Sequence, residues 1–501
     1  MLPPLLPAFG RAQKCVALFV AEQSNNMKFT SRVWKEKSFS LSHCKRLRLV
    51  MSNFVIFTTA NSASTTYAQS ITPARPSVSV VAQWKVQVGA GTVFIKGKKV
   101  SVAPTEPVAV GQPEEITVTA EQYSALPLFD GQSNGWKRGA RLKGTITQET
   151  SAENVLIPQS VLVTSAQEGG QTYAQDKDYA LDSQWGTIGR LPGSAINQKS
   201  TVYISYRYSP ARLDSITVNE SGKIQLRAGV SRVNLPLPPA IENGEVRLAN
   251  IWIPPLLSRL SDDNIFPISE AAYSEPPAPS PSVAERVLPK TLRKLMTGEP
   301  VKILAWGDSV TNGGFLPSSD DRWQNQFLRQ LKLRYPKANV ELVTESWPSK
   351  NSGSYLSEPP SSPHNYQEKV LGAKPDLIIS EFVNDSGLTV EQVEERYGAL
   401  LNDFQRQDTE WIILTPHYVT PNWMKLTRQK DIDEDPRVYV AALRRFAQGH
   451  PVALADASLR WGRLWRQGLP YTTLLSNGLN HPDTRGMKLF ADSLLRLFNR
   501  N

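Results

Sequence analysis

The spacing of apolar residues divides this chain of 501 residues into regions with different periods. Between residues 113 and 273, apolar residues alternate with polar ones or form short runs between turn residues, as in EEITVTA, STVYISYRYS and GEVRLANIWIPP. A period of two is typical of strands with one buried face, so many short strands of this kind predict an all-β, sandwich-like domain. The segment VNESGK separates two such runs and predicts a hairpin turn.

From residue 300 onward, continuous apolar runs alternate with amphipathic segments. The runs VKILAW, DLIISEF and EWIIL are mostly apolar, whereas DRWQNQFLRQLKLRYP and VEQVEERYGALLNDFQRQ have apolar residues at helical spacing. Apolar strands that alternate with helices are typical of a parallel sheet covered on both faces. We therefore predict an α/β domain over residues 300–501, with its chemistry at the carboxyl ends of the strands.

Two further segments separate or precede these domains. Residues 69–112 are rich in Pro, Val and Ser and contain a strand pair in TVFIKGKKVSV, so they predict a linker and the first strands. Residues 274–299 begin with the Pro-rich stretch SEPPAPSPS and continue into a short helix. This composition predicts a linker between the β-rich and the α/β domain.

The N-terminal 68 residues have the pattern of a targeting segment. Residues 1–50 contain nine Lys or Arg and two acidic residues, and an apolar patch and small residues follow up to Ala68. This order predicts a secretory signal peptide that is cleaved near Ala68, with a disordered extension as the alternative. Both cysteines, Cys15 and Cys44, precede this point, so a mature chain would hold no disulfide and no thiolate nucleophile. No run of about 18 apolar residues occurs, so we expect no transmembrane segment.

The net charge of +10 resides mostly in that N-terminal segment. The other residues include 47 basic and 44 acidic ones, which nearly balance. An extended basic face, and with it a nucleic-acid partner, is therefore not expected on the folded part.

Candidate chemistry begins with the stretch ILAWGDSVTNGG, where Gly307, Asp308 and Ser309 follow the first strand of the α/β domain. A helix that starts near Ser309 would present its positive end to a negative oxygen. Ser309 is a candidate nucleophile, and a helix cap is the alternative. A phosphate loop is disfavoured because the patterns G-x-x-x-x-G-K-[ST] and G-x-G-x-x-G are absent.

A serine nucleophile needs a base, and four histidines follow the predicted signal peptide. His481 precedes the last helix in the polar loop SNGLNHPDTRG, a place from which an imidazole can reach a strand end. His450 follows a helix and is expected to cap it, and His364 has no evident partner.

Three motifs, GDSVTNGG, EFVND and NGLNHP in this order, resemble those of the SGNH, or GDSL-type, hydrolases over residues 300–501. The resemblance implies a flavodoxin-like three-layer α/β/α fold and ester hydrolysis without a cofactor or metal. It implies that Ser309 is the nucleophile and His481 the general base. The oxyanion hole would consist of the backbone N–H groups of Ser309 and Ser349 and the side-chain amide of Asn384.

The sequence departs from the family pattern at several positions. Phe382 replaces a glycine before Asn384, and a Pro-Ser pair replaces the glycines of the second loop, with Gly353 as the less favoured donor. The acid that normally precedes the histidine is Asn477, whose amide would orient the imidazole in a Ser–His dyad. Otherwise a carboxylate elsewhere completes a triad, and Asp456 is the candidate, with a helix N-cap as its alternative role. Asp308 is expected to be a hydrogen-bonding residue of the turn.

The combination of a secretory signal, a β-rich domain and a GDSL-type domain resembles carbohydrate esterases that remove O-acetyl groups from polysaccharides. His417 and Trp423 in TPHYVTPNWM are candidates for lining the site, since aromatic faces suit sugars, although core packing explains them equally well. No long apolar stretch adjoins the site motifs. The alternatives are a lysophospholipase or thioesterase acting on lipid esters, and a non-catalytic glycan-binding protein.

Overall fold

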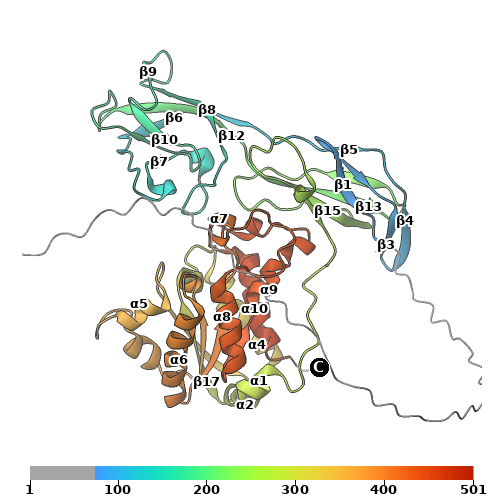
Figure 1. The fold of residues 1–501 in the computed structure, drawn as a ribbon, viewed down its shortest axis with the longest axis vertical. Helices are drawn as coiled ribbons and strands as arrows, with labels where there is room; N and C mark the ends of the chain where they lie inside the picture. The colour runs from blue at the N-terminus through green and yellow to red at the C-terminus, as the bar shows by residue number, and fades with distance from the viewer. Residues whose placement is uncertain (1–73, 500–501) are drawn as a thin grey trace, which may run out of the picture. The chain divides into compact units, whose positions relative to one another are not determined.

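The computed structural model describes residues 74–499 (Figure 1). The predicted signal peptide over residues 1–68 lies outside the described residues, as do both cysteines.

A five-stranded parallel sheet forms the centre of the C-terminal domain. In sheet order its strands are β18 (Asn339–Ser346), β17 (Pro300–Gly307), β19 (Leu377–Glu381), β20 (Glu410–Leu414) and β21 (Ala453–Ala455). The first strand along the chain, β17, lies inside the sheet with β18 on one side and β19 on the other. This order and the parallel pairing confirm the predicted α/β fold.

Helices cover both faces of the sheet. One face carries α1 (Val283–Val287), α2 (Pro289–Thr297), α4 (Trp323–Arg334), α9 (Ala457–Gly462) and α10 (Thr484–Arg496); the other carries α5 (Ser352–Ser357), α6 (Val390–Arg406) and α8 (Val438–Gly449). Successive strand residues point to opposite faces, so Ile303 and Ala305 pack into one core and Leu304 into the other. Two apolar faces per strand explain the continuous apolar runs in the sequence.

The preceding region is all-β, as predicted, and its sheets are antiparallel, but it contains two separate cores. The first contains β1 (Val78–Ala82), β2 (Lys85–Val88), β3 (Gly91–Ile95), β4 (Lys98–Val102), β5 (Val108–Ala109), β13 (Arg212–Asn219), β14 (Ile224–Arg227), β15 (Glu245–Ile253) and β16 (Ile265–Pro267). The second contains β6 (Ile116–Ser124), β7 (Ala140–Arg141), β8 (Leu156–Thr164), β9 (Thr172–Tyr173), β10 (Tyr179–Asp182), β11 (Thr187–Arg190) and β12 (Thr201–Tyr208). We call these the outer module and the inserted module.

The outer module changes the predicted role of the segment before residue 113. Val86 and Val102 are buried there in one core with Ile216 and Ile251, which lie more than a hundred residues later. Residues 78–110 are therefore half of a folded module that the inserted module interrupts, and not a linker with the first strands of the next domain. The predicted strand pair is present as β3 and β4, and the VNESGK turn joins β13 to β14.

The predicted linker of residues 274–299 is attached to the α/β domain. Its Pro-rich part forms an ion pair from Glu275 to Arg460. Its predicted short helix is a pair of helices, α1 and α2, and Leu288 between them is fully buried in the core beside the sheet. The outer module also contacts this domain, because Asn250 Nδ2 donates to Gly468 O at 2.8 Å.

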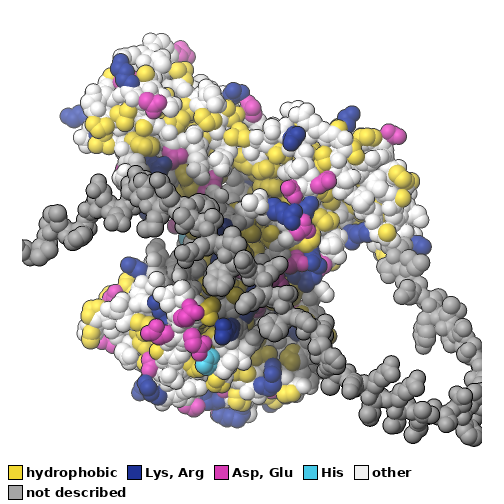
Figure 2. All heavy atoms as spheres, in the orientation of Figure 1, with side chains coloured by type: hydrophobic (Ala, Val, Ile, Leu, Met, Phe, Trp, Pro, Cys, Tyr) yellow, Lys and Arg dark blue, Asp and Glu magenta, His cyan; other side chains and the backbone are white. Residues whose placement is uncertain are grey.

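Charged side chains of both signs are interspersed on the face of the molecule shown in Figure 2. The described residues that are visible in this view therefore form no extended patch of one charge. Within residues 74–499, no helix combines the length and the apolar character that a membrane crossing requires.

Candidate active site

The stretch GDSVTNGG forms a tight turn from β17 into the short helix α3 (Ser309–Asn312). Asp308 caps this helix, since its Oδ1 accepts from Val310 N at 3.0 Å. Gly307 is required by close packing, because a Cβ there would lie 2.2 Å from Thr311 Oγ1. The turn thus places Ser309, half-buried, at the carboxyl end of a central strand.

The structure brings Ser309 and His481 together across 172 positions of sequence. His481 Nε2 lies 3.2 Å from Ser309 Oγ, and the histidine is only 6% exposed. Asp483 caps α10 directly after the histidine by accepting from Gly486 N at 2.9 Å. This is the contact between a hydroxyl and an imidazole that the sequence motifs predicted.

Asn477 shapes the loop that carries His481, but it does not bind the imidazole. Its Oδ1 accepts from the backbone N–H groups of Leu479, Asn480 and His481 at 2.9, 2.9 and 3.0 Å. The expectation that this amide accepts from the imidazole Nδ1–H is therefore wrong, because its oxygen is already occupied by three backbone donors.

Asp456 is not the missing acid either. At the end of β21 its carboxylate accepts from Arg444 Nε at 2.7 Å and from Thr415 Oγ1 at 3.0 Å. It stands at the N-cap position of α9, although its side chain makes no capping hydrogen bond. The prediction of Asp456 as a triad acid is contradicted, because its carboxylate binds Arg444 and Thr415, whereas His481 Nδ1 contacts other residues.

Two residues of the inserted module meet His481 Nδ1 instead, and neither was expected from the sequence. Glu149 Oε1 lies 3.1 Å from this nitrogen and Gln148 Oε1 lies 3.3 Å from it. The one signal in the sequence that could have led to them was the amide at position 477, which left the place of the acid open.

A third unexpected neighbour is Phe315, whose ring stacks on the imidazole of His481. The ring centroids are 4.0 Å apart and the planes differ by 9°. Phe315 follows directly after Gly313 and Gly314 of the GDSVTNGG motif, so the same turn that presents Ser309 also fixes one face of the histidine ring.

Burial and charge act in opposite directions on the imidazole. Burial lowers the pKa of His481, and the negative charge of Glu149 opposes this shift. The net lowering keeps the ring neutral near pH 7, so its Nε2 is able to accept a proton from the serine hydroxyl.

The predicted oxyanion donors lie on two loops that are joined to the serine turn. The backbone N–H of Asn384 donates to Asp308 Oδ2 at 3.1 Å, and its side-chain Nδ2 donates to Lys350 O at 3.2 Å. Ser349 is exposed and has φ 65°, the left-handed conformation that glycine adopts most easily. Its backbone thus has the form expected at the family's glycine position. Phe382 is buried against Trp306, which accounts for the departure from glycine there.

His417 and Trp423 differ in their surroundings. His417 is 0% exposed, and its Nε2 lies 2.8 Å from the backbone oxygen of Asn480, in the loop that carries His481. Its predicted role in lining the site is therefore wrong: full burial leaves it no surface for a substrate, and burial lowers its pKa well below the ordinary value. Trp423, on α7 (Pro421–Met424), is 54% exposed, and its role stays a prediction.

Two buried carboxyl groups, those of Asp308 and Glu381, lie at the turn that carries Ser309. Asp308 is 0% exposed, and burial raises its pKa to about 7. Glu381, also 0% exposed, has its pKa raised well above the ordinary value by burial and by the nearby charge of Asp308. With both of its oxygens engaged by backbone N–H groups, Asp308 is a hydrogen-bonding residue of the turn, as expected.

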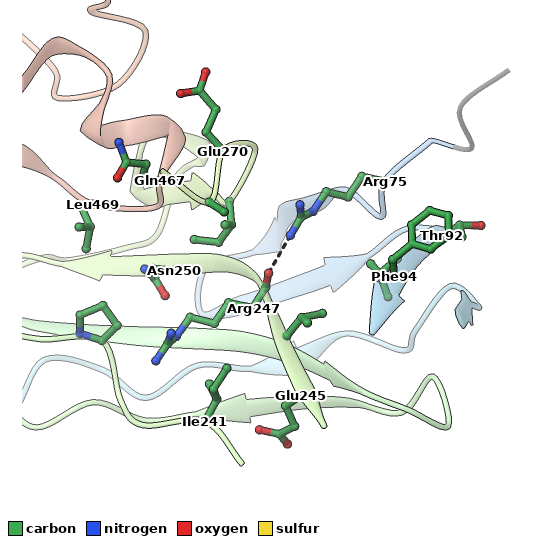
Figure 3. A pocket seen from close by; sticks show the side chains of 15 residues that line it. Arg75, Thr92, Phe94, Ile241, Glu245, Arg247, Asn250, Glu270, Gln467 and Leu469 are labelled. Carbon is green, nitrogen blue, oxygen red and sulfur yellow. Dashed lines mark hydrogen bonds between the residues drawn. The ribbon is translucent and has the colours of Figure 1, made fainter. Parts of the chain in front are cut away.

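A pocket of about 660 Å³ lies elsewhere, beside β15 and the segment with Gln467 and Leu469 (Figure 3). Arg75 donates there to Arg247 O at 2.9 Å. Among the described residues that line this pocket, none belongs to the predicted site.

Comparisons with known proteins concern the C-terminal part of the chain. The model of the GDSL-like lipase/acylhydrolase family matches residues 305–489, and no curated protein matches the chain. The strand order, the serine turn and this match show that the C-terminal part of the chain has the fold of that family.

Several solved structures are similar to parts of the chain. A two-domain esterase active on acetylated mannans has 14% identity and a TM-score of 0.35, over 42% of this chain and 52% of its own, so this chain spans about half its length. A catalytic mutant of an acetylxylan esterase from Geobacillus stearothermophilus has 17% identity and a TM-score of 0.33, over 40% and 95%. A carbohydrate acetylesterase family member from Sinorhizobium meliloti has 16% identity and a TM-score of 0.27, over 40% and 100%. By its family match and its own topology, residues 305–489 form a domain of the GDSL-like lipase/acylhydrolase family.

Proposed function

We propose that this protein is a secreted serine esterase that removes O-acetyl groups from a polysaccharide. The observation that carries the proposal is the 3.2 Å contact between Ser309 Oγ and His481 Nε2 at the carboxyl end of β17. A hydroxyl in hydrogen-bond contact with a buried neutral imidazole is the arrangement that activates serine as a nucleophile. Secretion is inferred from the N-terminal pattern, which lies outside the described residues.

In the proposed reaction, Ser309 Oγ attacks the ester carbonyl carbon while His481 Nε2 takes the hydroxyl proton. The negative charge on the carbonyl oxygen is stabilised by the N–H groups of Ser309 and Ser349 and by the amide of Asn384. Collapse of this intermediate breaks the bond to the sugar oxygen, which receives the proton from His481. Water then hydrolyses the acyl-enzyme, with His481 again acting as base.

The surroundings of Ser309 favour a sugar ester over a lipid. The loop after β18 lies beside the serine turn, since Trp347 N donates to Gly307 O at 3.0 Å. Trp347 is partly exposed; its ring stacks on His364, with centroids 4.5 Å apart, and Lys350 Nζ lies 5.1 Å from the ring centroid. Aromatic faces stack on sugar rings, and polar groups bind hydroxyls, whereas a long acyl chain needs a continuous apolar channel. Trp423 is a further candidate for contact with the glycan.

The substrate class is tested by comparing esters of different acyl length on the purified protein. We expect kcat/KM to be highest for acetyl esters and to fall by about tenfold or more for acyl chains of eight carbons, because a polar site offers no apolar surface on which a long acyl chain could be buried. Acetate release from acetylated xylan and acetylated mannan is measured alongside. Preference for long acyl chains or for lysophospholipid would identify a lipid ester hydrolase. Failure to hydrolyse any of these esters would overturn the enzymatic function.

The dependence of the rate on pH follows from the environment of His481. Its imidazole must be neutral to act as base, and its pKa is lowered by burial. We therefore expect kcat/KM to rise with pH and to reach its plateau with a midpoint below 6.5, the ordinary histidine value. The measurement is a profile of kcat/KM for a small acetyl ester between about pH 4 and 9. A midpoint at or above 6.5 would contradict the assigned base.

A further inference from the structure

We propose that the inserted β module supplies the acid of the catalytic triad, with Glu149 holding His481 through its Nδ1–H. This inference rests on the proposed function of Ser309 and His481. It makes a residue 160 positions before the nucleophile, on a different folded module, part of the catalytic arrangement.

Glu149 lies at the tip of a tight hairpin between β7 and β8. Thr147 N donates to Thr150 O at 3.0 Å, and Ile146 and Ser151 pair on either side of the turn. The two central residues of this turn are Gln148 and Glu149, the two that reach the imidazole. A short closed turn presents both side chains with little freedom of the backbone.

The hairpin tip is attached to the loop of His481. Thr150 is 1% exposed, and its Oγ1 donates to Asn477 O at 2.5 Å. At the base of the hairpin, Arg141 donates through Nη1 to Thr150 O at 2.9 Å. Two hydrogen bonds therefore hold Thr150, the residue next to Glu149, and fix the hairpin tip against the loop that carries the histidine.

The amide at position 477 fits a carboxylate arriving from the inserted module. Asn477 Nδ2 donates to Glu149 Oε1 at 3.1 Å, and the same oxygen lies 3.1 Å from His481 Nδ1. An aspartate at position 477 could not donate, and it would place a second negative charge against Glu149. The departure from the family pattern and the presence of Glu149 thus explain each other: the acid has changed its position in the chain, and the asparagine orients it.

Glu149 is favoured over Gln148 as the functional partner because of its charge. The imidazole Nδ1 has one proton to donate, and a hydrogen bond to a carboxylate is stronger than one to a neutral amide. When Nε2 takes the proton of Ser309, the ring becomes positive, and only Glu149 stabilises that charge. The proton on Nδ1 stays on the ring throughout. Glu149 is therefore a positioning residue that contacts the base and not the substrate.

The test compares Glu149→Gln with Glu168→Gln, a change of another exposed glutamate in the same module. For Glu149→Gln we expect kcat to fall on the order of 10²-fold with KM nearly unchanged, because the half-exposed carboxylate acts mainly on the charged transition state. The midpoint of the pH profile should move to lower pH, since the charge that raises the pKa of His481 has been removed. Glu168→Gln should match the wild type in both measurements.

A second readout does not depend on a substrate. A nitrogen NMR titration of the imidazoles, with His481 assigned by its loss in His481→Gln, should give a lower pKa for His481 in Glu149→Gln than in the wild type. If Glu149→Gln equals the wild type in kcat and in the pKa of His481, the inference is overturned even though Ser309→Ala is inactive. If Ser309→Ala retains the wild-type rate, the proposed function fails, and the triad with it.

Discussion

Replacement of Ser309 by alanine is expected to lower kcat for a small acetyl ester by at least about 10³-fold, because it removes the hydroxyl that His481 Nε2 would activate. The serine hydroxyl contacts His481 Nε2 at 3.2 Å, and its loss removes the nucleophile while the turn around it remains. The cap of α3 is made by Asp308, and not by Ser309, so the fold should be kept. The measurement is kcat together with the free energy of unfolding, which we expect to change by less than about 0.5 kcal/mol.

Two further variants sharpen this prediction. Ser386→Ala changes an exposed serine in the loop after β19 and should leave the rate unchanged. The double variant Ser309→Ala/His481→Ala should be no slower than Ser309→Ala, since the two residues act as one unit. A wild-type rate in Ser309→Ala, or an additive loss in the double variant, would show that Ser309 is only a residue of the turn.

The sequence was most informative where local pattern and burial coincide. The α/β domain has strands that are buried on both faces, so its continuous apolar runs and intervening helices predict the sheet directly. The outer β module was not foreseen as one unit, because the inserted module separates its strands and periodicity reports only local structure. The segment of residues 78–110 therefore looked like a linker, although its valines are buried against strands that follow residue 211.

The sequence predicted the two central residues of the site but not the acid that contacts the histidine. Ser309 and His481 each lie in a motif whose spacing to neighbouring residues is local, and the structure places them together. Glu149 has no such motif, since its role depends on how a hairpin of another module docks. The two alternatives for His417, lining the site and packing in the core, stayed open for a related reason: an aromatic residue after a strand end can point to solvent or into the core, and the sequence does not distinguish the two.

The docking of the inserted module has a consequence for how the catalytic domain works. In a GDSL-type domain with its own acid, the histidine loop and its carboxylate lie on one segment. Here the Asn477 side-chain oxygen accepts from three backbone N–H groups, and its amide nitrogen donates to Glu149. The shape of the histidine loop and the position of the acid therefore depend on the same side chain. The β-rich region is thus more than a binding accessory in the proposed mechanism.

Replacement of Asn384 by alanine is the second change with a large expected effect. Its side-chain amide is half-buried and donates to Lys350 O at 3.2 Å. In the proposed reaction this amide turns toward the oxyanion that forms beside Ser309. Removing one such donor typically costs about 10²–10³ in kcat. We expect a loss of this size with KM nearly unchanged, because the charge exists only in the transition state.

The fold should tolerate this substitution, since the bond that ties this loop to the serine turn runs from the backbone N–H of Asn384 to Asp308 Oδ2 and does not involve its side chain. Asn402→Ala, an exposed asparagine on α6, is the matched control and should keep the wild-type rate. Asn384→Asp provides a stricter comparison: it keeps the size of the side chain but replaces a donor with a negative charge, so its kcat should fall below that of Asn384→Ala. A loss smaller than about threefold in Asn384→Ala would instead mean that the N–H groups of Ser309 and Ser349 stabilise the oxyanion without it.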